Sequence, residues 1–533
     1  MPDDARSTST AGFVERLRSP SCYPHPASEI ELLETHISWV LLAGDYAYKI
    51  KKPVSLGFVD FSTPELRLRF CEEELRLNRR TAPELYLGVV PVTGTPDAPV
   101  MGGAGPAFDH AVKMRRFPQE ALLDRVAREG KLTAPQVEAF ARMVAAFHAR
   151  VAKADAGAAF GSPKEILAEA VDNFAQLERL DTDGATRAAR QALCAWTLFE
   201  FDRLEHAFAR RHRDGFVREC HGDLHLGNVA LLGGDPVAFD AIEFNEAFRW
   251  VDVMNEVAFP VMDLHHHGLP RLARRFVDAY LDATGDFAGL AVLRYYLVYR
   301  AMVRAKVSCI RAHQAGIGPA DRERSHKAWR GHLALAERLS RPGTPALVVM
   351  HGLSGSGKTT VSEAVVDALG AIRLRSDVER KRLHGLGKDA HTDAPPGGGI
   401  YTPGADRLTY ARLAELAGRI LDAGYPVIVD AAFLKRAWRE MFREFARERG
   451  VPFVLLACAA PEATLRERIL RREYQGTDAS EAGIAVLEHQ LASVEPLVED
   501  ELESALIVEA AGDGEFLPAV IERLSARLGI AAD

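Results

Sequence analysis

The chain has 533 residues, of which 47% are hydrophobic and 26% are charged, and this composition indicates a globular protein with more than one buried core. Its formal net charge of −8 disfavours a large non-specific nucleic-acid surface and a polybasic membrane anchor. The six scattered cysteines, the lack of an apolar run of about 18 residues and the polar start MPDDARSTST predict a cytoplasmic protein with reduced thiols, without a signal peptide or a membrane-spanning segment.

Short runs of β-branched and aromatic residues predict strands in the segment that follows residue 28. These runs occupy residues 36–42, 46–51, 87–92 and 111–117, and one helical pattern at 64–80 interrupts them. The Gly44–Asp45 pair favours a tight hairpin between the first two strands. From 119 to 339 apolar residues recur at three- and four-residue spacing, which indicates helices. A small strand-rich lobe followed by a helical lobe is the order of a two-lobe kinase.

A linker is predicted at 341–345, because the segment SRPGTP places two prolines and a glycine after the last helical pattern. Behind it, short apolar runs alternate with helical patterns, at 346–350, 372–374, 426–429, 453–457 and 505–508. This alternation predicts a parallel sheet covered by helices. We therefore expect an N-terminal extension at 1–28, an α+β two-lobe domain at 29–340 with lobes at about 29–117 and 118–340, and an α/β domain at 346–533.

The first candidate site residue is Lys49, in the predicted strand at 46–51. Strand alternation places Ala47 and Lys49 on one face, which is the A-x-K arrangement of a kinase strand whose lysine pairs with ATP phosphates. Lys51 shares that face and remains an alternative. Glu74, in the helical pattern, is the candidate partner acid. No GxGxxG motif precedes Lys49, so the chain departs here from the protein-kinase pattern.

The segment HGDLHLGN at 221–228 carries the second candidate site. An acid followed five residues later by an asparagine is the arrangement with which kinases orient the acceptor hydroxyl and hold Mg²⁺, which assigns these roles to Asp223 and Asn228. Asp240 follows the apolar Val237 and is the candidate second metal ligand. Ala241 stands after it, where protein kinases have a glycine.

The segment GLSGSGKTT at 352–360 fits the GxxxxGK[ST] phosphate-binding loop and lies, as that motif requires, between an apolar strand and a helix. Glycines allow backbone N–H groups to surround a phosphate, and the following helix adds its positive N-terminal end. The lysine would reach the β- and γ-phosphates and the hydroxyl after it would ligate Mg²⁺. The predicted nucleotide-binding residues are Gly352, Ser354, Gly355, Ser356, Gly357, Lys358, Thr359 and Thr360.

Two acids complete this second site. Asp377 follows the second predicted strand of the α/β domain and would orient or deprotonate the acceptor hydroxyl; the alternative is a helix N-cap. Asp430 ends the apolar strand at 426–429, which is a Walker-B position for Mg²⁺; the alternative is a solvated acid at a strand end.

The C-terminal half resembles the small P-loop kinases of the gluconate-kinase, zeta-toxin and polynucleotide-kinase group. The resemblance rests on the phosphate-binding loop, Asp377, Asp430 and the segment RILRR at 468–472, which precedes TDAS at 477–480. It implies an arginine-bearing lid over ATP, with Arg472 and Arg468 stabilising charge on the transferred phosphoryl group. The alternative is a solvated basic helix face, since residues four apart share one face.

The front domain resembles the aminoglycoside phosphotransferase family, whose loop reads HGDxxxxN and is followed by an aspartate on the next strand. Tyr48, the segment LNR at 77–79, HGDLHLGN at 221–228 and FDAIEF at 239–244 carry the resemblance. Over nearly its full length the chain is similar to a bacterial fusion of an aminoglycoside-phosphotransferase-like kinase with an ATP-binding P-loop kinase.

These patterns predict an ATP-dependent phosphotransferase with two ATP–Mg²⁺ sites and a small hydroxyl-bearing acceptor such as a sugar, an amino sugar or an aminoglycoside-like compound. No nucleic-acid or membrane partner is expected. Two alternatives remain. In the first, the domain at 346–533 would be a nucleic-acid end kinase. In the second, one domain would only sense ATP and control the other.

Overall fold

The computed structural model describes residues 12–57, 59–181, 184–314, 316–390, 392, 397–475, 483–510 and 514–531. The chain forms two compact units. The first unit comprises the residues up to 182 together with 197–267, and the second comprises 183–196 together with 268–533. Helix α6 (Gly184–Arg213) contributes residues to both.

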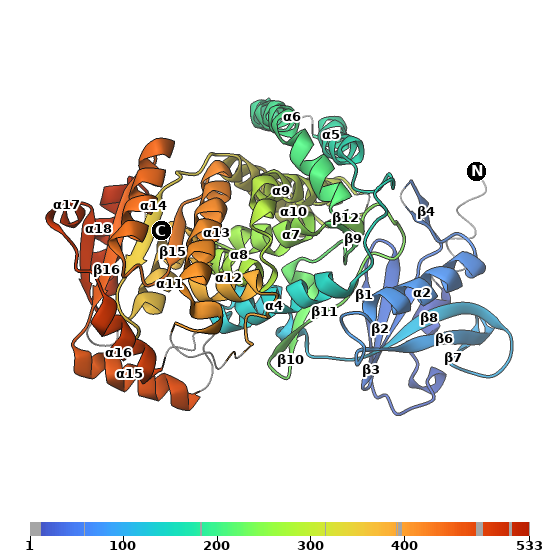
Figure 1. The fold of residues 1–533 in the computed structure, drawn as a ribbon. Helices are drawn as coiled ribbons and strands as arrows, with labels where there is room; N and C mark the ends of the chain where they lie inside the picture. Colours follow the sequence, from blue (N-terminus) through green and yellow to red (C-terminus); the bar gives the residue numbers. More distant parts are fainter. Residues whose placement is uncertain are drawn as a thin grey trace. The chain divides into compact units, whose positions relative to one another are not determined.

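An antiparallel sheet in the order β1-β2-β3-β8-β6-β7 forms the N-terminal part of the first unit (Figure 1). Helix α2 (Pro64–Asn78) packs on β8 and β6, and its first turn is capped by the Thr63 hydroxyl, which accepts the N–H of Leu66 at 3.3 Å. The strands are β1 (Ile30–Glu34), β2 (Ser38–Ala43), β3 (Tyr46–Lys51), β6 (Tyr86–Thr95), β7 (Ala98–Met101) and β8 (Ala107–Arg115), with β4 (Ser55–Leu56) and β5 (Val59–Asp60) as a separate hairpin.

The sheet has an apolar cluster on each face. On one face, Phe13 and Leu17 from the segment before β1 pack with Trp39, Leu41 and Ile50. On the other, the α2 side, the buried residues are Leu42, Ala47, Cys71, Tyr86 and Met114. Since side chains alternate along β3, Lys49 and Lys51 share the face of Ala47, as the sequence predicts.

The rest of the first unit is helical, with short antiparallel ribbons that carry the sequence motifs. Strand β10 pairs with β11, and β12 pairs with β9. The segment 221–228 lies between β9 and β10, and Asp240 follows β11. The elements are α3 (Leu123–Arg128), α4 (Ala134–Arg150), α5 (Pro163–Leu180), β9 (Val217–Glu219), β10 (Val229–Leu232), β11 (Asp235–Ala238), β12 (Trp250–Asp252) and α7 (Val253–His266).

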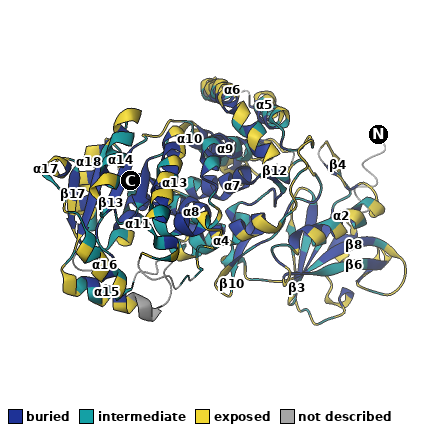
Figure 2. Cartoon of the chain, in the orientation of Figure 1, coloured by how far each residue is buried: buried dark blue, intermediate teal, exposed yellow. Residues whose placement is uncertain are grey.

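A parallel sheet in the order β14-β15-β13-β16-β17 forms the centre of the second unit, and its inner strands are buried (Figure 2). Its strands are β13 (Leu347–His351), β14 (Ile372–Arg375), β15 (Val427–Asp430), β16 (Phe453–Ala459) and β17 (Ala505–Glu509). The helices after β13 are α11 (Lys358–Leu369), α12 (Ser376–Leu383), α13 (Pro403–Asp422), α14 (Arg436–Arg449), α15 (Glu462–Gln475), α16 (Ile484–Ser493), α17 (Glu499–Leu502) and α18 (Leu517–Leu528).

Three further helices belong to this second unit: α8 (Pro270–Thr284), α9 (Leu290–Ala312) and α10 (Pro319–Leu339). Arginines of α8 hold the C-terminal end of α11. Arg271 lies 2.7 Å from Asp367, Arg275 pairs with the same carboxylate, and Arg274 donates to the Asp367 carbonyl at 2.6 Å. These helices precede the predicted linker at 341–345, and the domain limits stay a prediction.

The predicted fold classes are confirmed. Each apolar run behind residue 345 is a parallel strand within one or two residues of its predicted limits. Strand β1 was not predicted, since IELLE contains two glutamates, Glu31 and Glu34, and no clear alternation. Among the described residues, no helix has the length and apolar character needed to cross a membrane.

Candidate active sites

Two lysines of β3 and one glutamate of α2 form the centre of a charged cluster in the first unit. Lys49 Nζ lies 2.9 Å from Glu74 Oε1 and also forms an ion pair with Asp240. Lys51 Nζ lies 2.8 Å from Glu74 Oε2 and forms an ion pair with Glu243. The side chain of Lys51 is fully buried, whereas that of Asp240 is 43% exposed. Lys49, and not Lys51, therefore contacts the acid that opens to solvent.

The charges of this cluster stabilise one another. Burial alone would raise the pKa of Glu74, but Lys49 and Lys51 beside it lower that pKa to about 2. Burial alone would lower the pKa of Lys49, but Asp240 and Glu74 raise it well above its ordinary value. Both groups are therefore charged at neutral pH.

Asp240 has a left-handed backbone conformation, with φ of +65°, which is uncommon for a residue other than glycine. The structure on either side holds it there. The Asp240 N–H donates to Tyr86 Oη at 3.1 Å, and the N–H of Ala241 donates to Asn78 Oδ1 at 2.8 Å. Asn78 in turn donates to the carbonyl of Glu74 at 2.9 Å. The strained aspartate is thus tied to the helix that carries its lysine's partner.

The motif at 221–228 brings Asp223 and Asn228 together. Asn228 Nδ2 donates to the Asp223 carbonyl at 2.9 Å and to Asp223 Oδ2 at 3.1 Å. The ribbon β10–β11 begins just after Asn228 and ends before Asp240, and the N–H of Phe239 donates to the Asn228 carbonyl at 2.9 Å. The three residues predicted from their spacing are therefore brought to one end of this ribbon.

Glu256, on α7, holds the start of this motif. Its Oε1 accepts the N–H of His221 at 2.6 Å and that of Gly222 at 2.8 Å, and its Oε2 lies 2.8 Å from His148 Nε2. Glu256 is fully buried, which alone would raise its pKa, but the hydrogen bonds from His148 and Gly222 contribute to lowering the pKa to about 2. The loop before Asp223 is thus fixed by a buried carboxylate.

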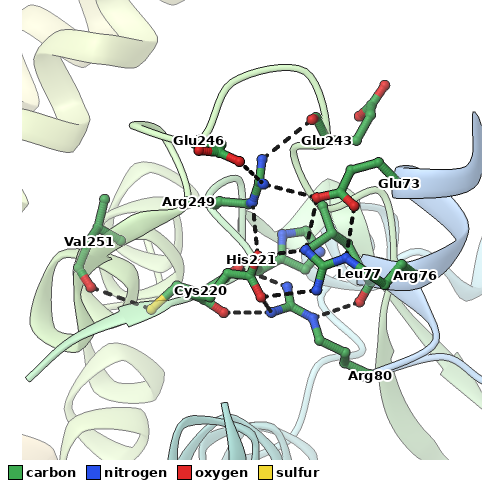
Figure 3. Close-up of polar contacts among 12 residues, drawn as sticks. Glu73, Arg76, Leu77, Arg80, Cys220, His221, Glu243, Glu246, Arg249 and Val251 are labelled. Atoms are coloured by element: carbon green, nitrogen blue, oxygen red, sulfur yellow. Dashed lines mark hydrogen bonds and ion pairs between the residues drawn. The ribbon is translucent and has the colours of Figure 1, made fainter. Parts of the chain in front are cut away.

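A network of arginines and glutamates joins α2 to strand β9 (Figure 3). Glu219 Oε1 lies 2.6 Å from Arg76 and 3.2 Å from Arg249. Arg80 donates to the Glu219 carbonyl at 2.6 Å and to the Cys220 carbonyl at 2.9 Å, immediately before the HGD segment. Arg249 also pairs with Glu73 of α2 at 2.9 Å. The helix that bears Glu74 is therefore anchored to the loop that bears Asp223.

Apolar side chains gather on the same face of the small sheet as Lys49. Phe117 and Phe239 pack edge to face with ring centroids 5.2 Å apart. They are partly buried, as are Leu33 and Val40, and they pack against the cluster that contains Ala47. Apolar side chains thus lie on the face of the sheet that also carries the ion pairs of Lys49.

The glycines of the second unit's phosphate-binding loop have the backbone conformations that the motif predicts. Gly352, Gly355 and Gly357 have φ of +147°, +82° and +89°. A Cβ at Gly352 would lie 2.4 Å from the carbonyl oxygen of Cys458, so no other residue fits there. Lys358 Nζ donates to the carbonyls of Gly352 and Leu353 at 3.0 and 2.8 Å, across the loop.

The loop also contains a polar atom that suits an anionic ligand. Ser356 is buried, and its Oγ has no hydrogen-bond partner among the described residues. Ser354 donates its N–H to Gln490 at 2.8 Å, while Thr359 and Thr360 are exposed in the first turn of α11. A helix N-terminus with exposed hydroxyls and an orphaned buried hydroxyl fits a phosphate and its cation.

Asp430 lies close to the first turn of α11. Ser362 Oγ lies 2.9 Å from Asp430 Oδ2 and 3.0 Å from the Thr359 carbonyl. Asp430, the predicted Walker-B acid, and Thr359, the predicted Mg²⁺-binding threonine, are thus joined through Ser362.

Asp377 lies inside the first turn of α12, whose N-cap position is taken by Arg375. The alternative interpretation of Asp377 as an N-cap is therefore wrong. Burial raises the pKa of Tyr410, and the charges of Asp406 and Asp377 raise it further. Arg380, one turn after Asp377, is buried and lies 2.8 Å from Asp406.

Of the two predicted lid arginines, Arg468 packs against the phosphate-binding loop. It donates to the carbonyl of Gly355 at 3.3 Å and to that of Ala510 at 2.7 Å. The side chain of Arg472 and the segment 477–480 lie outside the described residues.

Glu256, Glu219 and Ser362 were not predicted from the sequence. Glu256 gave one signal, as an acid inside the apolar helical run VMNEVAFPVM. Glu219 and Ser362 gave none, because a glutamate at a strand end or a serine in a helix has no distinctive spacing.

A family model described as an AAA domain matches residues 347–497. Uncharacterized protein Rv2004c of Mycobacterium tuberculosis strain H37Rv and uncharacterized protein Mb2027c of Mycobacterium bovis are each 30% identical to the chain over 464 residues, which cover 86% of this chain and 90% of each relative.

Solved kinases resemble separate parts of the chain. A choline/ethanolamine kinase family protein from Mesorhizobium loti is 12% identical and covers 61% of this chain and 99% of its own, with a TM-score of 0.35. A gluconokinase from Sinorhizobium meliloti is 26% identical and covers 35% and 97%, with a TM-score of 0.25.

Proposed function

We propose, from the premise that the chain belongs to the same family as the mycobacterial proteins Rv2004c and Mb2027c, that it is an ATP-dependent phosphotransferase with two ATP–Mg²⁺ sites. The acceptor is a small hydroxyl-bearing compound such as a sugar, an amino sugar or an aminoglycoside-like molecule. The single observation that carries the proposal is the convergence of Lys49, Glu74 and Asp240 in the first unit, beside the Asp223–Asn228 pair.

In the first unit, Lys49 contacts the ATP phosphates, and the apolar side chains around Phe117 and Phe239 contact the base. Asn228 and Asp240 would hold Mg²⁺, which when bound neutralises charge on the phosphates. Asp223 orients the acceptor hydroxyl and takes its proton. The acceptor oxygen then forms a bond to the γ-phosphorus while the bond to the β–γ bridging oxygen breaks, and ADP leaves.

In the second unit, the N–H groups from Gly352 to Thr360 and the Lys358 ammonium surround the phosphates. Thr359 and Asp430 would hold Mg²⁺, and Asp377 meets the acceptor hydroxyl. Arg468, and Arg472 beyond it, would stabilise charge on the transferred phosphoryl group.

The test is phosphoryl transfer from ATP by the purified chain to a panel of amino sugars, aminoglycosides, sugar acids and oligonucleotide ends. We compare Asp223→Asn, Lys358→Ala and the double variant. Loss of an acid that orients the acceptor is expected to lower turnover at its own site by about 10²–10⁴-fold. The matched control is Asp235→Asn, at the exposed first residue of β11, which leaves turnover unchanged.

Each rival predicts its own result. Oligonucleotide-stimulated turnover that falls as salt rises would favour the nucleic-acid end kinase. Tight ATP binding without transfer to any acceptor would favour the sensor and sink the two-kinase proposal.

A further inference from the structure

The proposed ATP site of the first unit, called the front site below, includes the ion pair of Lys49 with Glu74. A second lysine–glutamate pair, Lys51 with Glu243, lies next to it. Glu74 shares its two carboxylate oxygens between two lysines, with Oε1 2.9 Å from Lys49 and Oε2 2.8 Å from Lys51. Lys51 also forms an ion pair with Glu243, which follows Asp240 by three residues. The charges therefore alternate in one row: Asp240, Lys49, Glu74, Lys51 and Glu243.

The side chain of Lys51 is closed off from solvent and so cannot contact a nucleotide. Its side chain is fully buried, and its Nζ lies 4.8 Å from the centre of the buried ring of Phe61. Its backbone pairs with Ser38 on β2, while Lys49 pairs with Val40. Because β3 alternates, both lysines point to the same face, but only Lys49 reaches the exposed Asp240.

The buried carboxylates need Lys51 to remain charged side by side. Glu74 is fully buried and Glu243 is 4% exposed. Burial raises the pKa of Glu243, and the ammonium group of Lys51 opposes this effect. Without Lys51, the two buried carboxylates would lose the cation with which both form an ion pair, and their mutual repulsion would be unbalanced.

We propose that Lys51 and Glu243 are a positioning pair, which fixes the Glu74 carboxylate so that it presents Lys49 to the phosphates of ATP in the first unit. The proposal rests on the proposed front ATP site. The two lysines of β3 then have separate roles. Lys49 contacts the ligand, whereas Lys51 orients Glu74, the acid that holds Lys49 in place.

A positioning role and a purely structural role differ in what the double variant Lys51→Met/Glu243→Gln does. Removing both charges leaves no unpaired buried ion, so the fold is expected to recover where the single variant Lys51→Met loses stability. Glu74 still lacks its second lysine, so its carboxylate is no longer held from both sides. Positioning predicts a stable protein with weakened ATP binding, while a structural role predicts that stability and binding recover together.

The experiment measures Mg·ATP binding and the melting temperature of the full chain carrying Lys358→Ala, which removes the lysine of the phosphate-binding loop in the second unit. The same protein with Asp240→Asn in addition is the reference. The binding that is lost on adding Asp240→Asn belongs to the front site. We expect the double variant to melt close to its parent and to raise the front-site Kd by about 10-fold. The matched control is Lys52→Met/Glu34→Gln, the same charge changes in the exposed pair on the next residue, which leaves the Kd unchanged.

Three results would overturn the inference, and each is distinct. A double variant with parental Kd makes the pair purely structural. An equal loss in the control pair makes the effect non-specific. Absence of Asp240-dependent binding in the Lys358→Ala parent removes the proposed front site itself, and the inference with it.

Discussion

Gly222 shows how a single position fixes the HGD segment of the first unit. It has φ of +88°, and its N–H is bound by Glu256. A Cβ there would lie 2.7 Å from the carbonyl oxygen of Phe248, which is backbone and cannot move aside. Both the conformation and the space therefore demand glycine one residue before Asp223.

Gly222→Ala is accordingly expected to destabilise the first unit by more than about 1 kcal/mol, the typical cost of a left-handed alanine alone. Front-site ATP binding should weaken with it, because the segment leading to Asp223 must shift. The measurement is the melting temperature together with the Asp240-dependent Kd. Gly234→Ala is the control: it has φ of +96° but nothing within 4 Å of its Cβ, so an equal effect on binding would refute the steric argument.

Glu256 makes the stability of the first unit depend on pH in a defined direction. Its pKa falls from an ordinary 4.5 to about 2 on folding, so its stabilisation is fully present above about pH 4.5 and is lost as the pH falls toward 2. A shift of this size corresponds to roughly 2–4 kcal/mol at neutral pH. Glu256→Gln should therefore lower the free energy of unfolding at pH 7 by that order.

The difference between wild type and Glu256→Gln should shrink as the pH is lowered from 5 toward 2, as followed by denaturant titrations at several pH values. A difference that stays constant across this window would mean that the carboxylate charge contributes nothing.

At the scale of elements, helix α2 is held from two directions. Its buried Glu74 forms ion pairs with the two lysines of β3. Arg76 in its last turn and Arg80 just after its end are joined to Glu219 and the start of the HGD segment (Figure 3). We therefore expect a change at β9 to affect the position of Glu74.

Glu219→Gln keeps the side-chain volume but removes the charge that balances Arg76, Arg80 and Arg249. Because Arg249 is 3% exposed, the unbalanced charge cannot be fully hydrated, and we expect a loss of about 1–3 kcal/mol in stability with a raised front-site Kd for ATP. Thermal unfolding and nucleotide titration measure the two effects. Glu129→Gln, in an exposed pair with Lys131, should change neither.

At the scale of the whole molecule, the sequence predicted what local patterns encode. Short runs of β-branched, aromatic or apolar residues predicted β3 and the strands of the parallel sheet, and the GxxxxGK[ST] spacing between a strand and a helix predicted the phosphate-binding loop. Alternation could not separate Lys49 from Lys51, since both share one face and only packing buries the second. Nor could helical periodicity show which sheet α8 packs on, because a basic helix face such as that of Arg271 and Arg275 has the same pattern whether it is solvated or paired.

The pairing of α8 with α11 leads to the final prediction, which concerns the second unit as a body. Asp367 receives Arg271 and Arg275 at the C-terminal end of α11, and the other end of this helix carries Lys358 and Thr359. Asp367→Asn in the full chain removes an ion pair from Arg275, whose side chain is 10% exposed and which also lies 3.4 Å from Glu363.

We expect Asp367→Asn to lower the stability of the second unit by about 1–3 kcal/mol and to weaken ATP binding at the rear site, measured in the Asp240→Asn background. The control Asp422→Asn removes the carboxylate of an exposed pair with Arg449 and should leave both unchanged. If the Asp367→Asn variant has the melting temperature of its parent, the arginines of α8 contact α11 without stabilising it. The second unit would then need only the residues behind the predicted linker. If stability and binding fall together, the P-loop sheet depends on helices that precede that linker, and a chain cut at 341–345 would lose part of its own core support.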